Sequence, residues 1–136
     1  MNDQVESRLT VLSNQIIMSS QVSGHSLSTL STHVLDTNTG LPATGMKVIL
    51  EKCIGDDKYQ LLASSSTNSD GRSREFPQLE NGTYKITFFT EDYFKNNNIT
   101  NYFFPKASID FIVNSTRHYH VPLLLSPFSF STYRGS

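Results

Sequence analysis

Apolar and polar residues alternate along most of the chain in short runs, and turn-forming residues separate the runs. In residues 28–36, Leu30 and Val34 fall on one side of an extended chain, whereas Ser31 and His33 fall on the other. Comparable runs predict further strands, at residues 46–50, 59–64, 72–76, 84–88, 109–113, 117–125 and 128–133. Because short strands divided by Gly- and Asn-containing turns are typical of two packed sheets, the sequence predicts an all-β, two-sheet antiparallel sandwich.

One segment departs from the alternation. Thr90 precedes two acidic residues, Glu91 and Asp92, which is typical of a helix N-cap followed by acids in the first turn. The asparagine run at residues 96–98 is expected to end a helix that starts there. The sequence therefore predicts one short helix near residues 91–95.

Residues 1–27 are rich in Ser, Gln and Asn and have no sustained period, which predicts a flexible leader before a domain of residues 28–136. Arg8-Leu9, five residues and then Gln15-Ile16 resemble the amino-terminal peroxisomal targeting nonapeptide, with a departure at Ile16. This resemblance implies a peroxisomal location, with the cytoplasm as the alternative. So loose a pattern also arises by chance, and the residues leave that interpretation open.

The length, charge and composition of the chain argue against several classes of protein. A chain of 136 residues has room for one modest domain, and a net charge of -1 gives no basic excess for nucleic acid. No apolar stretch is long enough to cross a membrane. The single cysteine, Cys53, excludes an internal disulfide and a multi-cysteine zinc site, and it fits a reducing compartment.

Residues 117–136 carry most of the candidate chemistry. His118 and His120 share one strand face, and the chain stays rich in aromatic residues almost to its end. Chain ends usually fray, so this pattern predicts a terminus that is paired and held in place. Two imidazoles, a guanidinium, hydroxyls and a carboxylate would suit a hydrolytic site or an anion site, and the residues alone leave both open.

The strand around Pro122 raises two further expectations. Proline cannot donate to a sheet ladder, so Pro122 predicts an edge strand or a break in pairing. The apolar run Leu123–Leu125 is then expected at a subunit interface, the alternative being that it covers the protein's own core.

Three segments resemble one family, the transthyretin-like 5-hydroxyisourate hydrolases of urate breakdown. They are Ser31-Thr-His33-Val-Leu-Asp36-Thr with Gly40-Leu-Pro42-Ala, then Asp70-Gly71-Arg72, then His118-Tyr-His120-Val-Pro122-Leu-Leu-Leu-Ser-Pro with Tyr133-Arg134-Gly135-Ser136. The resemblance covers residues 27–136 in the same order. Its most discriminating feature is the Tyr-Arg-Gly-Ser terminus, because transthyretin itself, the hormone carrier on this fold, does not end that way.

The resemblance implies a transthyretin-like (prealbumin-like) sandwich of two four-stranded sheets with one short helix. It implies a homotetramer, formed as a dimer of dimers, with active sites in a central channel. The implied reaction is hydrolysis of 5-hydroxyisourate, a purine-derived small molecule, to 2-oxo-4-hydroxy-4-carboxy-5-ureidoimidazoline, without a cofactor. Two alternatives stay open: a non-catalytic, transthyretin-like carrier of a small ligand, and a sandwich module that recognises a protein partner through a free edge.

The resemblance also assigns candidate catalytic residues. By position, the family's two histidines fall on His33 and His120, its arginine on Arg72, and its terminal serine on Ser136. An imidazole exchanges protons near neutral pH and can activate water. The forked guanidinium of Arg72 would orient the substrate's carbonyl and anionic edge and stabilise charge in the transition state.

The rest of the tail is implied to line the substrate site. Tyr133, Arg134 and Gly135 complete the terminal motif. His118 is a further candidate for substrate binding because it shares a face with His120, although it matches no catalytic role in the family. Arg74 also has no match.

Plainer interpretations of the same residues remain. His33, next to Val34, could be a core histidine, and Arg72 could be a solvated residue of a turn. His118, His120 and His33 could together bind a divalent metal. We expect no metal, because the tail offers neither a carboxylate side chain nor a cysteine beside these histidines.

Overall fold

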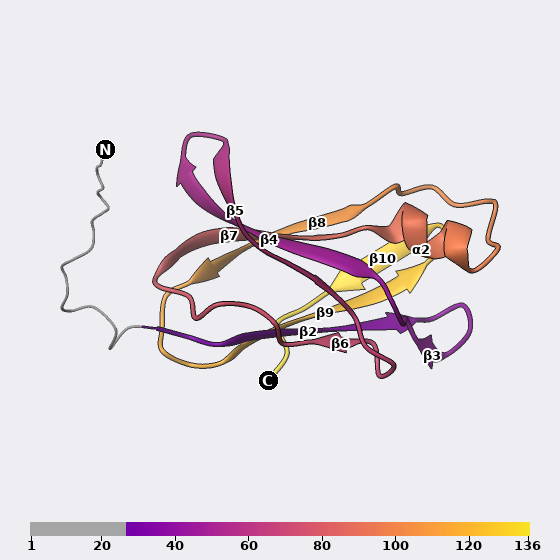
Figure 1. The fold of residues 1–136 in the computed structure, drawn as a ribbon, viewed down its shortest axis with the longest axis horizontal. Coiled ribbons are helices and arrows are strands. Elements are labelled where there is room, and N and C mark those ends of the chain that lie inside the picture. The colour runs from indigo at the N-terminus through magenta and orange to yellow at the C-terminus, as the bar shows by residue number, and fades with distance from the viewer. Residues whose placement is uncertain (1–26) are drawn as a thin grey trace.

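The computed structural model describes residues 27–136, which form two sheets packed face to face with one short helix at one end (Figure 1). The elements are β2 (Leu30–Asp36), β3 (Leu41–Pro42), β4 (Lys47–Gly55), β5 (Lys58–Ser66), β6 (Arg72–Ser73), β7 (Gly82–Phe88), α2 (Thr90–Asn96), β8 (Ala107–Val113), β9 (Tyr119–Ser126) and β10 (Ser129–Thr132). The predicted class, an all-β sandwich with a single short helix in the described chain, is confirmed.

The two sheets differ in how their strands run. One sheet has the order β5-β4-β7-β8, and every neighbouring pair in it is antiparallel. The other has the order β10-β9-β2-β3, with β6 also pairing with β2. Its central pair, β2 and β9, is parallel, which departs from the purely antiparallel expectation. Parallel pairing is possible here because the whole of the other sheet lies between these strands in sequence and supplies the long crossover that parallel strands need.

The core lies between the sheets and follows the predicted alternation. Its most deeply buried side chains come from both layers and include Val34, Val48, Leu50, Tyr84, Ile86, Phe88, Leu123 and Leu125. Strand β2 also sends two polar side chains inward, Thr32 and Asp36. The Thr32 hydroxyl donates to the Val121 carbonyl at 2.5 Å, and Asp36 accepts a hydrogen bond from the Tyr93 hydroxyl, so neither is buried without a partner.

The interface expected at Leu123–Leu125 is wrong for two of the three leucines. Leu123 and Leu125 are 0% and 1% exposed within the subunit's own core. Only Leu124, between them, faces outward and is half-buried. Strand alternation explains the difference, because residues one apart point to opposite faces.

On the β10 side of β9, Pro122 lies at a break in pairing, as predicted, whereas on the other side it pairs in register with His33 of β2. Strand β10 pairs with β9 from Ser126 to Leu123 and stops there. The chain then leaves the sheet and rejoins it at Gly135, which forms a bridge with His120. Pro122 stands between these two points, where its missing N–H costs no ladder bond.

Helix α2 is anchored differently from the prediction. Phe89 is the N-cap and offers no side-chain cap, so the prediction of Thr90 as the cap is wrong. The Thr90 hydroxyl instead donates to the Phe104 carbonyl at 2.8 Å. The buried Tyr93 fixes the helix to the sandwich by donating its hydroxyl to Asp36 Oδ2 at 2.8 Å.

Two expectations concern what lies outside this domain. The predicted leader falls almost wholly within residues 1–26, so the targeting-like motif at residues 8–16 lies outside the described residues. In the described part of the chain, no helix has the length and apolar character needed to cross a membrane.

Candidate active site

The predicted catalytic residues meet on the outer face of the β2–β9 pair. On β2, Thr32 and Val34 point into the core and are fully buried, whereas His33 between them points outward and is half-buried. His33 pairs in register with Arg72 of β6. On β9, His120 pairs in register with Ser31, on the other side of β2. Neighbouring strands lie about 4.8 Å apart, so this register brings the three side chains into one cluster and excludes a core histidine at position 33.

A chain of hydrogen bonds fixes His120 of β9 and His118, which lies just before that strand. Ser31 Oγ lies 2.8 Å from His120 Nδ1 and 2.8 Å from His118 Nε2. The opposite ring nitrogen of His118, Nδ1, lies 2.6 Å from Thr29 Oγ1. His118 is exposed, but both of its ring nitrogens are engaged. Two hydroxyl residues of the first strand region therefore orient both imidazoles.

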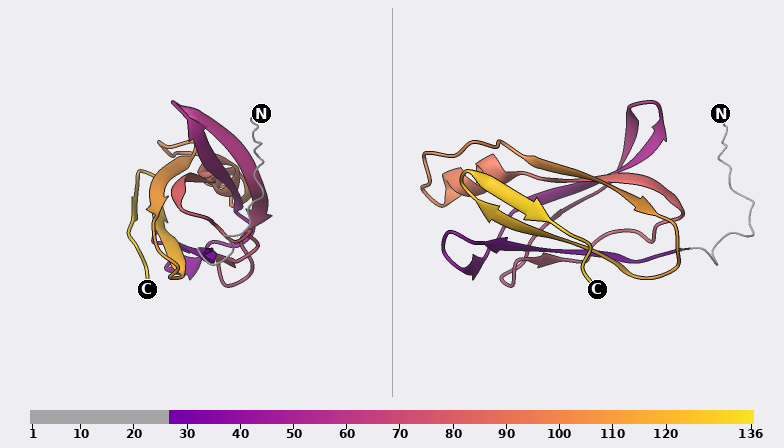
Figure 2. Two further views of the ribbon diagram at one scale, coloured as in Figure 1. Left: turned by 90° about the vertical axis from the view of Figure 1, so that its left-hand side faces the viewer. Right: turned by 180° about the vertical axis from the view of Figure 1, so that it is seen from behind.

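The C-terminal segment returns to the outer face of this sheet (Figure 2). Gly135 N donates to the His120 carbonyl at 2.8 Å. A Cβ at position 135 would overlap the His120 ring and stand 3.1 Å from its Cγ, so only glycine allows this approach. Ser136 follows directly, is exposed, and so lies next to the cluster. The prediction of a terminus that is paired and held in place is confirmed at Gly135.

Tyr133 and Arg134 lie elsewhere within the subunit. Both line a hollow of about 320 Å³ shared with β8 residues such as Asp110. The Arg134 guanidinium stands over the Tyr119 ring, 4.2 Å from its centroid. Tyr119 points to the core side of β9, opposite to His120, so the structure does not bring Tyr133 and Arg134 into the histidine cluster.

A tight loop positions Arg72. Asn68 Oδ1 accepts hydrogen bonds from the backbone N–H groups of Asp70 and Arg72, at 2.9 and 3.0 Å. Between these two residues, Gly71 has a φ of +74°, and its missing side chain leaves room for the Val34 carbonyl, which a Cβ would approach to 2.5 Å. The loop therefore needs glycine to deliver Arg72 beside β2, and Arg72 is more than a solvated turn residue.

The surroundings of His33 favour its neutral form. Burial lowers the pKa of His33 below its usual value, and the positive charge of Arg72 lowers it further. A backbone hydrogen bond at Asp70 and the Asp70 carboxylate act in the opposite direction but do not reverse the shift.

His120 behaves in the same way. Burial lowers its pKa most, followed by the charges of Arg72, His118 and His33, and a backbone hydrogen bond at Ser31 opposes them. Both histidines are therefore neutral at pH 7, each with a bare ring nitrogen that can accept a proton. A neutral imidazole beside a guanidinium is the pairing needed to activate water and to stabilise the oxyanion it produces.

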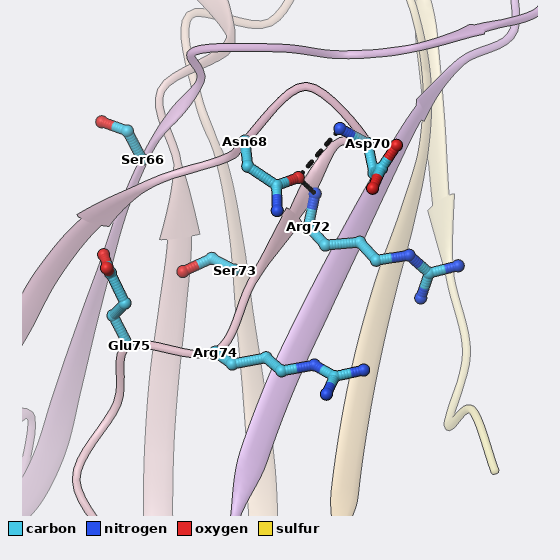
Figure 3. Close-up of a pocket in the computed structure, with 7 residues that line it drawn as sticks. All are labelled: Ser66, Asn68, Asp70, Arg72, Ser73, Arg74 and Glu75. Carbon is cyan, nitrogen blue, oxygen red and sulfur yellow. Dashed lines mark hydrogen bonds between the residues drawn. The ribbon is translucent and has the colours of Figure 1, made fainter.

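A second arginine stands beside the first. Figure 3 shows the guanidinium groups of Arg72 and Arg74 pointing in one direction, while Ser73 and Glu75 point in the other. These residues line a hollow of about 460 Å³ together with Ser66, Asn68 and Asp70. Arg74 also lines a neighbouring hollow of about 500 Å³ with Thr29, Leu30, Phe76 and His118. The two hollows extend the polar surface past the histidines toward the start of β2.

The described residues do not gather a metal ligand set. Among residues 27–136, no three or more His, Cys, Asp and Glu side chains are grouped so as to hold a metal ion. Both ring nitrogens of His118, and Nδ1 of His120, lie against hydroxyl oxygens instead. The metal alternative therefore has no support from the geometry of this part of the chain.

Sequence reasoning assigned no role to three residues of this surface: Thr29, Ser31 and Arg74. Strand alternation places Ser31 on the face of His33, which is a usable signal, but it gives no reason to expect a bond to a histidine of a distant strand. Alternation gives even less reason to expect Thr29 and Arg74 at the site, because the residues beside them, such as His118, come from other segments of the chain.

Comparison with known proteins agrees with this architecture. The chain is 44% identical over 114 residues to the 5-hydroxyisourate hydrolase of Deinococcus radiodurans, covering 79% of this chain and 95% of that protein. Its structure resembles that of Klebsiella pneumoniae 5-hydroxyisourate hydrolase with a TM-score of 0.71 and 40% identity, over 80% of this chain and 99% of the other.

A more distant likeness is to sea bream transthyretin, whose structure was determined in complex with thyroxine. The TM-score is 0.74 at 27% identity, over 78% of this chain and 93% of that one. A model described as "HIUase/Transthyretin family" matches residues 30–135, which include all of the sandwich strands. The chain therefore belongs to the HIUase/Transthyretin family.

Proposed function

We propose that this chain is a hydrolase that opens 5-hydroxyisourate to 2-oxo-4-hydroxy-4-carboxy-5-ureidoimidazoline. Relatives named for this activity align with it over most of their length at 40–44% identity. The observation that carries the proposal is the meeting of His33, Arg72 and His120 on three adjacent strands, although the residues are far apart in sequence. The substrate is a small purine-derived molecule, and the proposed steps use only the chain's own side chains.

The proposed reaction begins with water held by the two neutral histidines. One imidazole accepts a proton as the water oxygen bonds to a ring amide carbon, and the carbonyl oxygen takes up negative charge. The guanidinium of Arg72 stabilises that oxyanion. The carbon–nitrogen bond then breaks and the departing nitrogen takes the proton back. The carbonyl carbon is left as a carboxylic acid, which becomes a carboxylate by releasing its remaining proton to solvent.

The terminal residues are proposed to complete the site. Gly135 lies against His120, so the hydroxyl and carboxylate of Ser136 are within reach of substrate or water there. Tyr133 and Arg134 remain candidate substrate-binding residues. They lie outside the histidine cluster of one subunit, so a role in binding would require the tail to move or a second subunit to approach.

The test is a direct assay. Urate oxidase converts urate to 5-hydroxyisourate, the protein is added, and the ultraviolet decay is compared with the spontaneous rate. We expect the decay to accelerate in proportion to protein concentration. An unchanged rate would refute the hydrolase and favour the carrier alternative. That alternative predicts an apolar ligand site, whereas the site face carries three histidines and two arginines.

We further propose that the subunits form a homotetramer. Among residues 27–136, the outermost strands on one side of the sandwich, β8 and β10, have no further strand on their outer edges, and such edges are available for pairing with another chain. Near these edges Ile112 and Phe128 are 64% and 58% exposed. Light scattering after size-exclusion chromatography should give four times the subunit mass, and a monomeric mass would reject the proposal.

We also propose a peroxisomal location, on the targeting-like motif at residues 8–16. A fluorescent reporter fused to residues 1–27 should accumulate in peroxisomes. A matched fusion carrying Arg8→Ala should stay in the cytosol. Cytosolic fluorescence from both fusions would reject the location.

A further inference from the structure

Ser31 occupies an unusual position between two imidazoles. Its hydroxyl oxygen lies 2.8 Å from His118 Nε2 on one side and 2.8 Å from His120 Nδ1 on the other. Thr29 Oγ1, at 2.6 Å from His118 Nδ1, extends the series to the surface. Ser31 is only 5% exposed, so bulk water cannot readily replace either partner.

The chemistry of a hydroxyl restricts this arrangement. A serine hydroxyl has one hydrogen to donate, and its lone pairs accept. When Ser31 donates to His120 Nδ1, the facing nitrogen of His118 must carry a hydrogen and donate to Ser31. When Ser31 donates to His118 Nε2, His120 Nδ1 must carry the hydrogen. As long as the Ser31 hydroxyl donates to one of the two rings, one of the nitrogens that face it is bare and the other is protonated.

We propose that Thr29, His118, Ser31 and His120 form a proton relay, in which Ser31 passes to His118 the proton that His120 takes from water. This proposal deepens the hydrolase function proposed above and rests on it. His120 is the catalytic residue in this scheme, whereas Ser31, His118 and Thr29 act through it as positioning and relay residues.

The relay balances as a single shift of hydrogens. Before the step, both rings are neutral and protonated at Nδ1, and the Ser31 hydroxyl donates to His118 Nε2. Water gives a proton to His120 Nε2, His120 Nδ1 gives its hydrogen to Ser31, and Ser31 gives its own hydrogen to His118. Afterwards His120 is neutral and protonated at Nε2, His118 is an imidazolium, and the hydroxide bonds to the substrate carbon. The reverse shift returns the proton to the leaving nitrogen.

The electrostatic surroundings favour this outward movement. A proton kept on His120 would stand in a half-buried position near the cationic Arg72, and both burial and that charge lower the pKa of His120. His118 is exposed, so water can solvate its charge. Arg74 lines the same hollow and opposes a charge on His118, but solvent and salt there screen it.

Two readouts test the relay on the full-length chain, and the first is kinetic. Removing the bridge in Ser31→Ala should lower kcat by about 100-fold, as for loss of a proton-transfer route. Ser31→Thr keeps a hydroxyl and should recover most of that loss. His118→Ala should also slow turnover, and added imidazole should restore it in a concentration-dependent way. Ser108→Ala is the matched control, because it removes a strand hydroxyl that bonds Thr87 on the other sheet.

The second readout needs no turnover. Nitrogen-15 spectra of the histidine rings should show opposite protonation at His120 Nδ1 and His118 Nε2 in the native chain, and this correlation should vanish in Ser31→Ala. A kcat of Ser31→Ala within twofold of native, or unchanged ring spectra, would overturn the relay. Loss of activity in Ser31→Ala without recovery in Ser31→Thr would show that Ser31 contributes only through packing, and it would also overturn the relay. If the native chain itself shows no hydrolysis, the proposed function fails, while the ring spectra still decide whether the two histidines are coupled.

Discussion

Strands β2 and β9 present two different surfaces from one pair of backbones. Toward the core, Val34 and Leu123 are both 0% exposed and pack among apolar side chains of the opposite sheet. Toward the outside, His33 and His120 are half-buried and lie beside the guanidinium of Arg72. The two surfaces differ because the side-chain period of a strand is two residues.

This comparison indicates that the two faces of the β2–β9 pair have different roles. The core face contributes the free energy of burial, and the outer face carries groups whose charge state and orientation matter more than their packing. Substitutions on the outer face should therefore change turnover with little effect on the unfolding free energy. Substitutions on the core face should do the reverse.

The largest effect is expected from His120→Asn on the outer face. Asparagine keeps a polar side chain of similar reach but cannot take a proton from water, so kcat should fall by at least about 100-fold. The melting temperature should stay within a few degrees of native, because no core contact is lost. Steady-state assays with thermal unfolding would measure both quantities. Near-native turnover in this variant would remove the central catalytic assignment.

The converse substitution is Leu123→Ala on the core face, three residues further along β9. Removing a fully buried leucine side chain should lower the unfolding free energy by about 2–5 kcal/mol, from lost burial and the cavity left behind. Turnover per folded molecule should stay close to native below the melting temperature. Urea denaturation and active-fraction assays would test this, and a selective loss of kcat without destabilisation would break the division between the faces.

The tail tests whether the outer face depends on close packing. Gly135→Ala would force a methyl group against the His120 ring, so the terminal segment should lift from the sheet and kcat should fall by about 10-fold. The matched control is Gly55→Ala at the end of β4, where a Cβ meets nothing closer than Lys58 at 4.0 Å. Equal kinetics for the two variants would show that the tail does not shape the site.

The pH dependence of the activity tests how charge on the outer face of β2 and β9 controls the histidines. Because the pKa values of His33 and His120 are lowered, both should stay neutral as the pH falls to about 6.5, and activity should decline only below that. In Arg72→Gln, the loss of a positive charge should raise both pKa values and move the acid limb of kcat/KM to higher pH. An unmoved limb would show that Arg72 does not control these protonation states.

The same shifts have a consequence for stability. At pH values below about 6.5 the unfolded chain binds protons at His33 and His120 more readily than the folded chain does. The unfolding free energy should therefore fall as the pH decreases through this window, and by less in Arg72→Gln than in the native chain. Urea denaturation across this pH range would measure the difference.

The alternating pattern was sufficient to predict which face of β2 turns inward. It placed Leu30 and Val34 in the core and His33 outside, because strand periodicity is a local steric property. The same alternation explains why the interface predicted at Leu123–Leu125 was wrong. That prediction used only the run of three apolar residues, although alternation sends the first and third inward.

What the sequence does not determine is how distant strands are registered. The parallel pairing of β2 with β9 sets Ser31 opposite His120, and no local signal announces a partner 89 positions away. The family resemblance identified His33, Arg72 and His120 as candidate catalytic residues, but it gave no role to Ser31 or Thr29. The hydroxyls of these two residues can be recognised as part of the site only once the structure places histidines beside them. The cap prediction at Thr90 failed for a related reason, because a tertiary acceptor, the Phe104 carbonyl, takes its hydroxyl.

The smallest effect is expected far from the outer face, in the sheet that carries no candidate chemistry. Lys52 of β4 forms an ion pair with Glu80, whose side chain is 63% exposed. Exposed pairs contribute less than about 1 kcal/mol, and salt screens them, so Glu80→Gln should shift the melting temperature slightly at low salt and not at high salt. The backbone carbonyl of Glu80 would still accept the Tyr84 hydroxyl, at 2.7 Å, so the local fold is retained. Kinetics at saturating substrate should be native. A marked loss of turnover would mean that the second sheet controls the site through the core, and the separation between the two faces of β2 and β9 would then be incomplete.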